Sequence, residues 1–143
     1  MRVLTCLVTF TIAAALAGLG AAASDEPPLN LTPAVAAAER WLATLDSGRY
    51  TDTWEEAATI FKDGAPRSFW EPAVQAARQP LGGVIARKVR SMRYVNALPN
   101  APPGHYVIIE FDTHFEKRPL SVETVTPMRT KAGDWKVAGY FIR

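Results

Sequence analysis

Residues 106–115 read YVIIEFDTHF, and the alternation within this stretch decides the fold. Its apolar side chains share one parity, and they are Val107, Ile109, Phe111 and Phe115. Its acids and imidazole share the other parity, and they are Glu110, Asp112 and His114. Because successive side chains of a strand point to opposite faces, we expect the apolar set to pack against other elements and the polar set to face water.

Three further β-rich runs surround this stretch, each bounded by turn residues. The pattern changes from helical to extended after Gly82 and Gly83, and residues 131–134 (KAGD) form a tight turn before the final run. The four expected strands are residues 84–98, 106–115, 120–129 and 135–142. Short connections favour sequential antiparallel pairing.

The residues before Gly82 show helical spacing of apolar side chains. Breaks at Gly48 and at residues 63–66 (DGAP) divide them into three expected helices, residues 32–47, 52–61 and 68–79. Helices grouped before strands indicate the α+β class. We therefore expect three N-terminal helices packed on one face of a curved four-stranded antiparallel sheet, as a single domain over residues 32–143.

The first 23 residues are typical of a cleavable signal peptide. Arg2 precedes an uncharged apolar run, and Ala21, Ala22 and Ala23 offer small side chains to a signal peptidase. An uncleaved anchor is the alternative, but the run is shorter and richer in Ala and Gly than the roughly 20 apolar residues that span a bilayer comfortably. We expect a bacterial protein in the periplasm or secreted, with residues 24–31 as a linker and no membrane span after cleavage.

Removal of residues 1–23 takes away Arg2 and the single cysteine, Cys6. The exported domain is then almost neutral, which gives no general attraction to nucleic acid. It also has no thiol for a disulfide or a thiolate metal site. The basic residues of the first expected strand do not form one patch unless a bulge intervenes, because Arg87 and Arg93 differ in parity from Lys88 and Arg90.

The second half of the chain resembles a known family. The residues that carry the resemblance are 122–128 (VETVTPM) and the ending 135–143 (WKVAGYFIR), together with Trp41, Leu42 and residues 48–50 (GRY). They are similar to a bacterial family of small secreted proteins that is a domain of unknown function. The resemblance implies no activity or catalytic residue. The order of helices then sheet is more loosely similar to the nuclear-transport-factor-2-like or cystatin-like cone, a fold with many functions.

The candidate ligand-binding residues are aromatic or polar. Trp41, Trp54 and Trp70 fall one on each expected helix and are candidates to line a cavity between helices and sheet, although such spacing is also typical of a packed core. The candidates for polar contacts are Tyr94, Glu123 and Thr126. Glu123 favours an enzyme if it is buried beside a tyrosine at an open pocket.

No catalytic residue, metal site or cofactor is predicted. Asp112 and His114 are expected on the solvent side of the sheet, and His105 and His114 lack a third ligand. We therefore expect an exported non-enzymatic module that binds a small apolar ligand or a protein partner. Apolar residues on both parities of residues 135–142 also suggest a homodimer. The alternative function is a cone-fold isomerase or dehydratase that uses a buried carboxylate or tyrosine.

Overall fold

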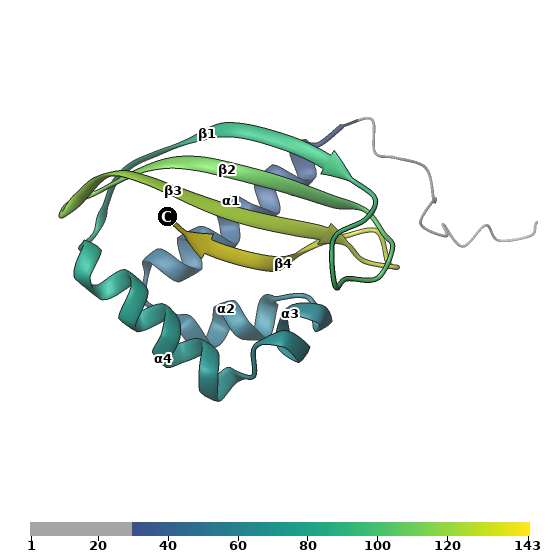
Figure 1. Ribbon diagram of the computed structural model, residues 1–143, viewed down its shortest axis with the longest axis horizontal. Helices are drawn as coiled ribbons and strands as arrows, with labels where there is room; N and C mark the ends of the chain where they lie inside the picture. The colour runs from purple at the N-terminus through teal and green to yellow at the C-terminus, as the bar shows by residue number, and fades with distance from the viewer. Residues whose placement is uncertain (1–29) are drawn as a thin grey trace, which may run out of the picture.

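The structure is a computed structural model that describes residues 30–143. The predicted signal peptide and all of the predicted linker except Asn30 and Leu31 lie outside the described residues. Helices precede strands, as the sequence predicts (Figure 1). The helices are α1 (Thr32–Asp46), α2 (Tyr50–Glu56), α3 (Thr59–Gly64), α4 (Arg67–Arg78) and the 3₁₀ turn η1 (Gln79–Leu81). The strands are β1 (Val84–Val95), β2 (Tyr106–Phe115), β3 (Arg118–Arg129) and β4 (Trp135–Ile142).

The four strands form one antiparallel sheet in the order β1-β2-β3-β4, which is the predicted meander. Helix α1 crosses one face of this sheet, while α2, α3 and α4 lie beside the edge formed by β4 (Figure 1). The strand β4 is therefore the edge strand that faces most of the helical residues. This arrangement positions the candidate site described below.

The prediction of three N-terminal helices is wrong, because the described chain has four α-helices. The expected helix over residues 52–61 is interrupted at Ala57 and Ala58, whose backbone is extended. The N–H of Ala58 donates a 2.8 Å hydrogen bond to the carbonyl of Val137 in β4. Both alanines are buried. Tertiary pairing with the sheet thus replaces the local helical bonds that the sequence pattern favours.

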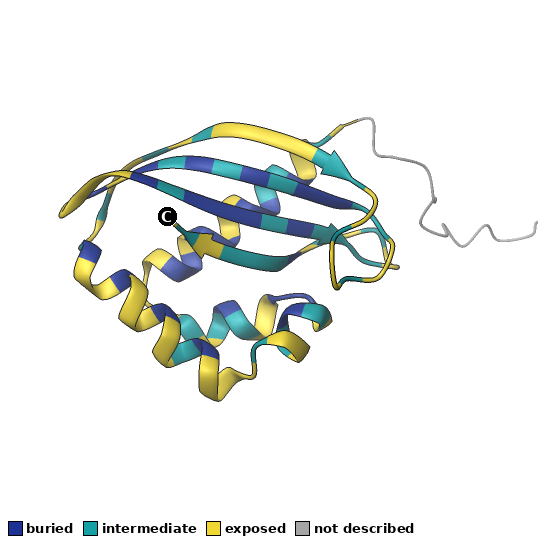
Figure 2. Ribbon diagram, viewed as in Figure 1, coloured by how far each residue is buried: buried dark blue, intermediate teal, exposed yellow. Residues whose placement is uncertain are grey.

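The expected alternation in β2 is confirmed (Figure 2). Val107, Ile109, Phe111 and Phe115 are at most 1% exposed. Glu110 and Asp112 are half-buried and His114 is exposed. Val107, Ile109 and Phe111 belong to one core cluster with the apolar stripe of α1, which includes Trp41 and Leu42. Full burial of one such side chain stabilises a fold by about 1.5–3 kcal/mol, so this layer is the centre of the core.

A bulge in β4 explains why apolar residues occur at both parities of this strand. Thr126 pairs with Gly139 while Pro127 pairs with Val137, so Ala138 is the extra residue. Pro127 has no N–H to offer the ladder, and proline within sheets is tolerated at such bulges. Val137 and Tyr140 consequently both face the core side. Dimerisation through the outer face stays a prediction, which light scattering at micromolar concentration tests.

A second bulge lies in β1 at Arg90, because Val89 pairs with Phe111 and Ser91 pairs with Glu110. The shift changes which basic residues share a face. Arg87 pairs opposite the inward-facing Thr113, whereas Lys88 pairs opposite the outward-facing Asp112 and Arg93 opposite Ile108. The bulge therefore separates Arg87 from the other basic residues of the strand and sends its side chain toward the helices.

Candidate functional site

Two of the three candidate tryptophans come together. The rings of Trp41 and Trp70 lie 5.9 Å apart, and the ring of Tyr140 lies 5.3 Å from that of Trp41. Thr53 satisfies both indoles, because its carbonyl accepts from Trp41 Nε1 at 2.9 Å and its hydroxyl accepts from Trp70 Nε1 at 3.0 Å. This aromatic cluster joins α1, α4 and β4, and it forms part of the core.

The other tryptophan and two polar candidates lie elsewhere. Trp54 donates to the carbonyl of Ala65 at 2.8 Å and lies under the Lys62 ammonium. The Tyr94 hydroxyl is 2.7 Å from Nδ1 of His105. Thr126 pairs with Gly139 on the face of the sheet opposite α1. The structure thus does not gather the six predicted ligand-binding residues at one place.

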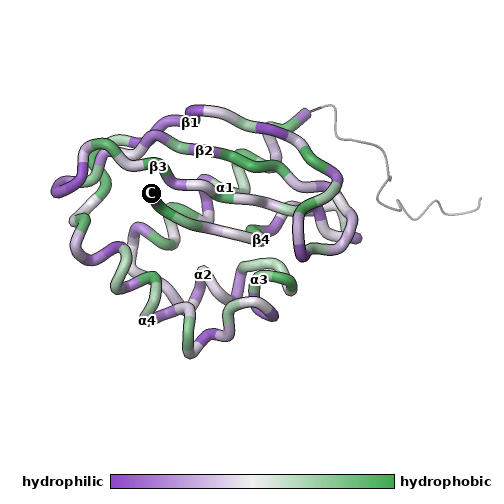
Figure 3. Tube along the Cα trace, viewed as in Figure 1, coloured by the Kyte–Doolittle hydropathy of each residue, from purple (hydrophilic) through white to green (hydrophobic). Residues whose placement is uncertain are grey.

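An apolar groove lies between the helices and the edge strand β4. Its volume is about 510 Å³, and α3, α4 and β4 form its walls. All of the lining residues are uncharged, and they are Ile60, Phe61, Gly64, Ala65, Phe69, Trp70, Ala73, Val74, Ala77, Ala138, Gly139, Tyr140, Phe141 and Ile142. Figure 3 shows hydrophobic residues along α4 and β4, the two elements that supply most of this lining. The groove therefore offers an environment for apolar groups.

Two large aromatic side chains at the groove are exposed to solvent. Phe69 of α4 is 64% exposed and Phe141 of β4 is 54% exposed. They belong to opposite walls. An apolar surface of this kind beside a groove is typical of a binding site, because single-chain proteins usually keep such patches small.

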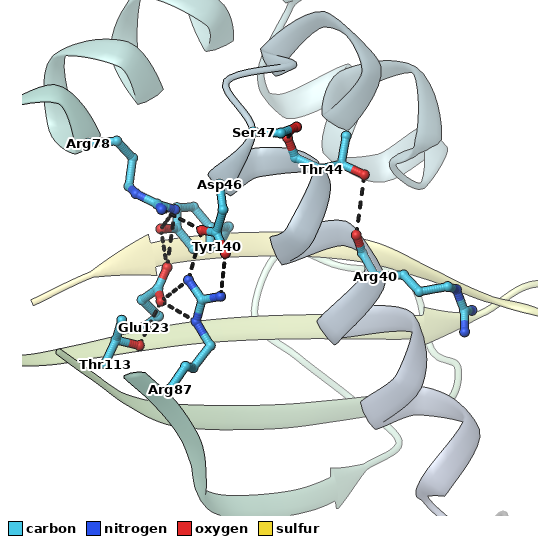
Figure 4. A network of polar contacts seen from close by, with 9 residues as sticks. All are labelled: Arg40, Thr44, Asp46, Ser47, Arg78, Arg87, Thr113, Glu123 and Tyr140. Atoms are coloured by element: carbon cyan, nitrogen blue, oxygen red, sulfur yellow. Dashed lines mark hydrogen bonds and ion pairs between the residues drawn. The ribbon is translucent and has the colours of Figure 1, made fainter. Parts of the chain in front are cut away.

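A cluster of charged side chains joins the helices to the sheet, and we call it the charged quartet: Asp46, Arg78, Arg87 and Glu123 (Figure 4). The four come from α1, α4, β1 and β3. Glu123 is completely buried and Arg78 is 7% exposed. Two carboxylates balance two guanidinium groups, so the quartet has no formal net charge. Such balance is what a buried cluster of charges requires.

The carboxylate of Glu123 is surrounded by donors. Its Oε1 accepts from Arg87 Nε at 2.8 Å and from the hydroxyl of Thr113 at 2.7 Å. Its Oε2 accepts from the hydroxyl of Tyr140 at 2.6 Å and from Arg78 at 3.4 Å. Asp46 receives both terminal nitrogens of Arg87, at 2.6 and 2.9 Å, and also pairs with Arg78. Ion pairs and hydrogen bonds thus connect all four members.

The surroundings of Asp46 and Arg87 favour the charged form of both side chains. Burial alone raises the pKa of Asp46, but hydrogen bonds from Arg87 and Arg78 outweigh burial and hold that pKa below its ordinary value. Burial lowers the pKa of Arg87, and its bond to Asp46 and the charge of Glu123 overcome this, so the pKa of Arg87 is raised. Burial and the nearby charge of Glu123 raise the pKa of Tyr140, which keeps its hydroxyl protonated as a donor.

Of this cluster, the sequence pattern singled out Glu123 alone. It did not indicate the partners of Glu123, which are Arg78, Arg87, Thr113 and Tyr140, or Asp46, which pairs with both arginines. A signal existed for Arg78, because it continues the buried stripe of Trp70 and Val74 at four-residue spacing. A cation on an apolar stripe is buried only with a partner. No signal pointed to Arg87, since its orientation depends on the bulge at Arg90.

The outer-face polar residues form an ordinary charged surface. Asp112 lies 3.5 Å from Arg90, and Glu110 pairs with Arg143 at 2.6 Å. Within residues 30–143, no group of three His, Cys, Asp or Glu side chains is placed to hold a metal ion. In the same part of the chain, none of the helices has the length and hydropathy to span a membrane.

The fold and this site define a small α+β domain with an apolar groove at the edge of an antiparallel meander. The chain belongs to the family described as protein of unknown function DUF4019, whose model matches residues 37–140. The match covers the whole charged quartet and Tyr140. Membership of a domain-of-unknown-function family, expected from the sequence, is confirmed. No curated protein and no solved structure matches the chain.

Proposed function

We propose that this domain is a non-enzymatic module that binds an apolar ligand or an apolar segment of a protein in the groove between α3, α4 and β4. The observation that carries the proposal is the uncharged lining of a groove of about 510 Å³. This volume falls within the range of about 300–1,000 Å³ that small-molecule sites occupy. Water displaced from such a lining favours the binding of apolar groups.

The side chains at the base of the groove are held in place by contacts within the domain. Trp70 and Tyr140 line the groove, and their rings lie 6.1 Å apart in an edge-to-face arrangement. The Trp70 indole and the Tyr140 hydroxyl are each anchored by a hydrogen bond, to Thr53 and Glu123. A site whose side chains are already fixed loses little conformational entropy when it is occupied.

The module is proposed as non-enzymatic because the quartet leaves no free acid or base. Each carboxylate oxygen of Glu123 accepts from one arginine side chain and from one hydroxyl group. A general base needs a lone pair directed at the proton that it removes. The arrangement instead supports a structural role, in which the quartet fixes α1 and α4 to the sheet.

Binding of a fluorescent apolar dye tests this function. We expect 1-anilinonaphthalene-8-sulfonate to bind the native domain, and Ala73→Glu to weaken binding at least about tenfold, because a carboxylate at the groove wall loses hydration without a partner. Ala76→Glu is the matched control, since Ala76 is exposed on the same helix and does not line the groove. Equal binding by both variants, or no binding to the native domain, contradicts the proposal.

A second candidate function rests on the burial of Glu123 against Tyr140, which is the arrangement that would favour a cone-fold isomerase or dehydratase. Such an enzyme abstracts a proton next to a carbonyl group. The test is α-proton exchange of cyclohexanone in D₂O, followed by NMR. Acceleration by the native domain that Tyr140→Phe abolishes would establish the enzyme, and an unaccelerated rate supports the binding module.

We also propose that the module acts outside the cytoplasm. The support is the apolar run after Arg2 and the small residues Ala21, Ala22 and Ala23. The proposal predicts Ser24 as the first residue of protein recovered from the cell envelope. Intact Met1 on that protein would favour the membrane anchor instead.

A further inference from the structure

The free edge of β4 has backbone groups without strand partners. Arg143 N donates to Val122 O at 3.0 Å, and Val122 N donates to Arg143 O at 2.9 Å. In an antiparallel pair, residues that exchange two bonds alternate with residues whose N–H and C=O point away from the neighbouring strand. Following the register from this pair, the N–H and C=O of Tyr140 and Ile142 point away from β3. Helix α4 lies on that side of β4 (Figure 1).

The same edge already accepts a main-chain partner farther along. The carbonyl of Val137 receives the 2.8 Å bond from Ala58. Within residues 30–143, the edge groups of Tyr140 and Ile142 have no main-chain partner of this kind. Natural edge strands are usually protected by charges, by proline, by bulges or by a covering helix or loop, and here α4 lies beside the edge but leaves the groove open. Residues 137–142 contain neither a charge nor a proline, and Ala138 supplies only a bulge at the start of the open portion.

The position of α4 decides what can reach this edge. Phe69, Trp70 and Ala73 of α4 form the wall of the groove opposite β4. A folded sheet, including the β4 edge of a second copy, would bring further strands and side chains against this wall. A single extended chain is the occupant that needs the least separation between α4 and β4. Because the lining is uncharged, a charged residue in the centre of that chain would be desolvated without a partner.

We propose that the groove binds an extended, uncharged apolar segment of a partner protein, which pairs with β4 as a fifth strand of the sheet. The inference rests on the proposed function and adds the chemistry of the occupant. Main-chain bonds to Tyr140 and Ile142 supply affinity, and alternate side chains of the segment contact Trp70 and Phe69. Addition of a strand to an open edge is a recurring mode of peptide recognition.

Matched synthetic peptides test the inference. The probe is an eight-residue alternating valine–threonine segment with one lysine at each end for solubility. The control has the same sequence with N-methyl groups on alternate residues, which removes the donors of one strand edge and leaves the apolar side chains. We expect the probe to slow amide exchange of Tyr140 and Ile142 at least about tenfold and to bind at least about tenfold more tightly than the control.

The outcomes separate the two proposals. Dye binding together with equal affinity for both peptides, or with unchanged amide exchange, overturns strand pairing and leaves the apolar groove as a binding site. Absence of both dye and peptide binding overturns the proposed function itself. Ala73→Glu is expected to reduce probe binding and Ala76→Glu to leave it unchanged. Equal probe binding by these two variants places the peptide outside the groove and contradicts the inference.

Discussion

The hydroxyl of Tyr140 in β4 donates a 2.6 Å hydrogen bond to Oε2 of Glu123 in β3. The ring that bears this hydroxyl lines the groove, while the carboxylate belongs to the charged quartet. The bond therefore connects the candidate binding surface with the charges that join helices and sheet. Substitutions in the quartet should consequently change both the free energy of unfolding and the binding of ligands at the groove.

Removal of the Glu123 charge should strongly destabilise the domain. In Glu123→Gln, Arg78 and Arg87 keep their charges but lose one carboxylate, and breaking a buried ion pair costs about 3–5 kcal/mol. Urea denaturation measures the loss as a lower midpoint. Glu39→Gln removes an exposed carboxylate from α1 and is the control, with an expected change within about 0.5 kcal/mol. Similar midpoints for the two variants would contradict the structural role of the quartet.

Stability should fall in acid through Asp46. Its pKa is lowered from 3.8 in the folded state, so its contribution is complete above the unfolded pKa and is lost as pH falls through the folded value. The free energy of unfolding should therefore decrease as pH falls below about 4. Asp46→Asn should reduce this dependence. A hydrogen bond from Thr130 also lowers the pKa of Asp134, which has no ion pair to an arginine among the described residues. Asp134→Asn is therefore the comparison that isolates the contribution of Asp46.

Stability should also fall in alkali through Tyr140. Its pKa is raised above 10.0 by burial and by the charge of Glu123, so the unfolded chain loses this proton first. The contribution is complete below the unfolded pKa and is lost as pH rises through the folded value. Unfolding followed from pH 9 to 11 should show a decline that is smaller in Tyr140→Phe. Burial raises the pKa of Tyr106 as well, and Tyr106→Phe should leave the Tyr140 share of the decline in place.

The contribution of the hydrogen bond between Ala58 and Val137 to the free energy of unfolding should be measurable by a single substitution. Ala58 has φ −64° and Ala57 has ψ 160°, which suit a proline and the residue before it. Ala58→Pro therefore removes the donor without a change of backbone shape, and it should cost about 1 kcal/mol. Ala58→Val keeps the N–H and adds carbon atoms at the same buried position, and it is the control for the bulk of the proline ring. A proline variant as stable as the native domain would show that the bond is not needed to hold α3 against β4.

The sequence predicted those parts of the fold that depend on local periodicity. The β2 alternation placed Val107 and Phe111 inside correctly, and the turn at residues 131–134 led to the meander order. The division of the second helix at Ala57 was not predictable, because its cause is a bond to a strand far away in the chain. The partners of Glu123 were not predictable for a similar reason. Arg87 reaches Glu123 only because a bulge in β1 changes which face of the sheet the Arg87 side chain occupies.

The bulge at Ala138 determines which face of the sheet Tyr140 occupies. Because Ala138 is the extra residue of the ladder, Tyr140 lies opposite Val125, on the same face as Glu123, and its hydroxyl reaches that carboxylate. In a ladder without the bulge, Ala138 would lie opposite Thr126 and Tyr140 opposite Thr124, which would turn the tyrosine out to solvent. Deletion of Ala138 would remove the extra residue and keep Tyr140 opposite Val125. The bond to Glu123 therefore depends on the register of β4 and not on the alanine side chain.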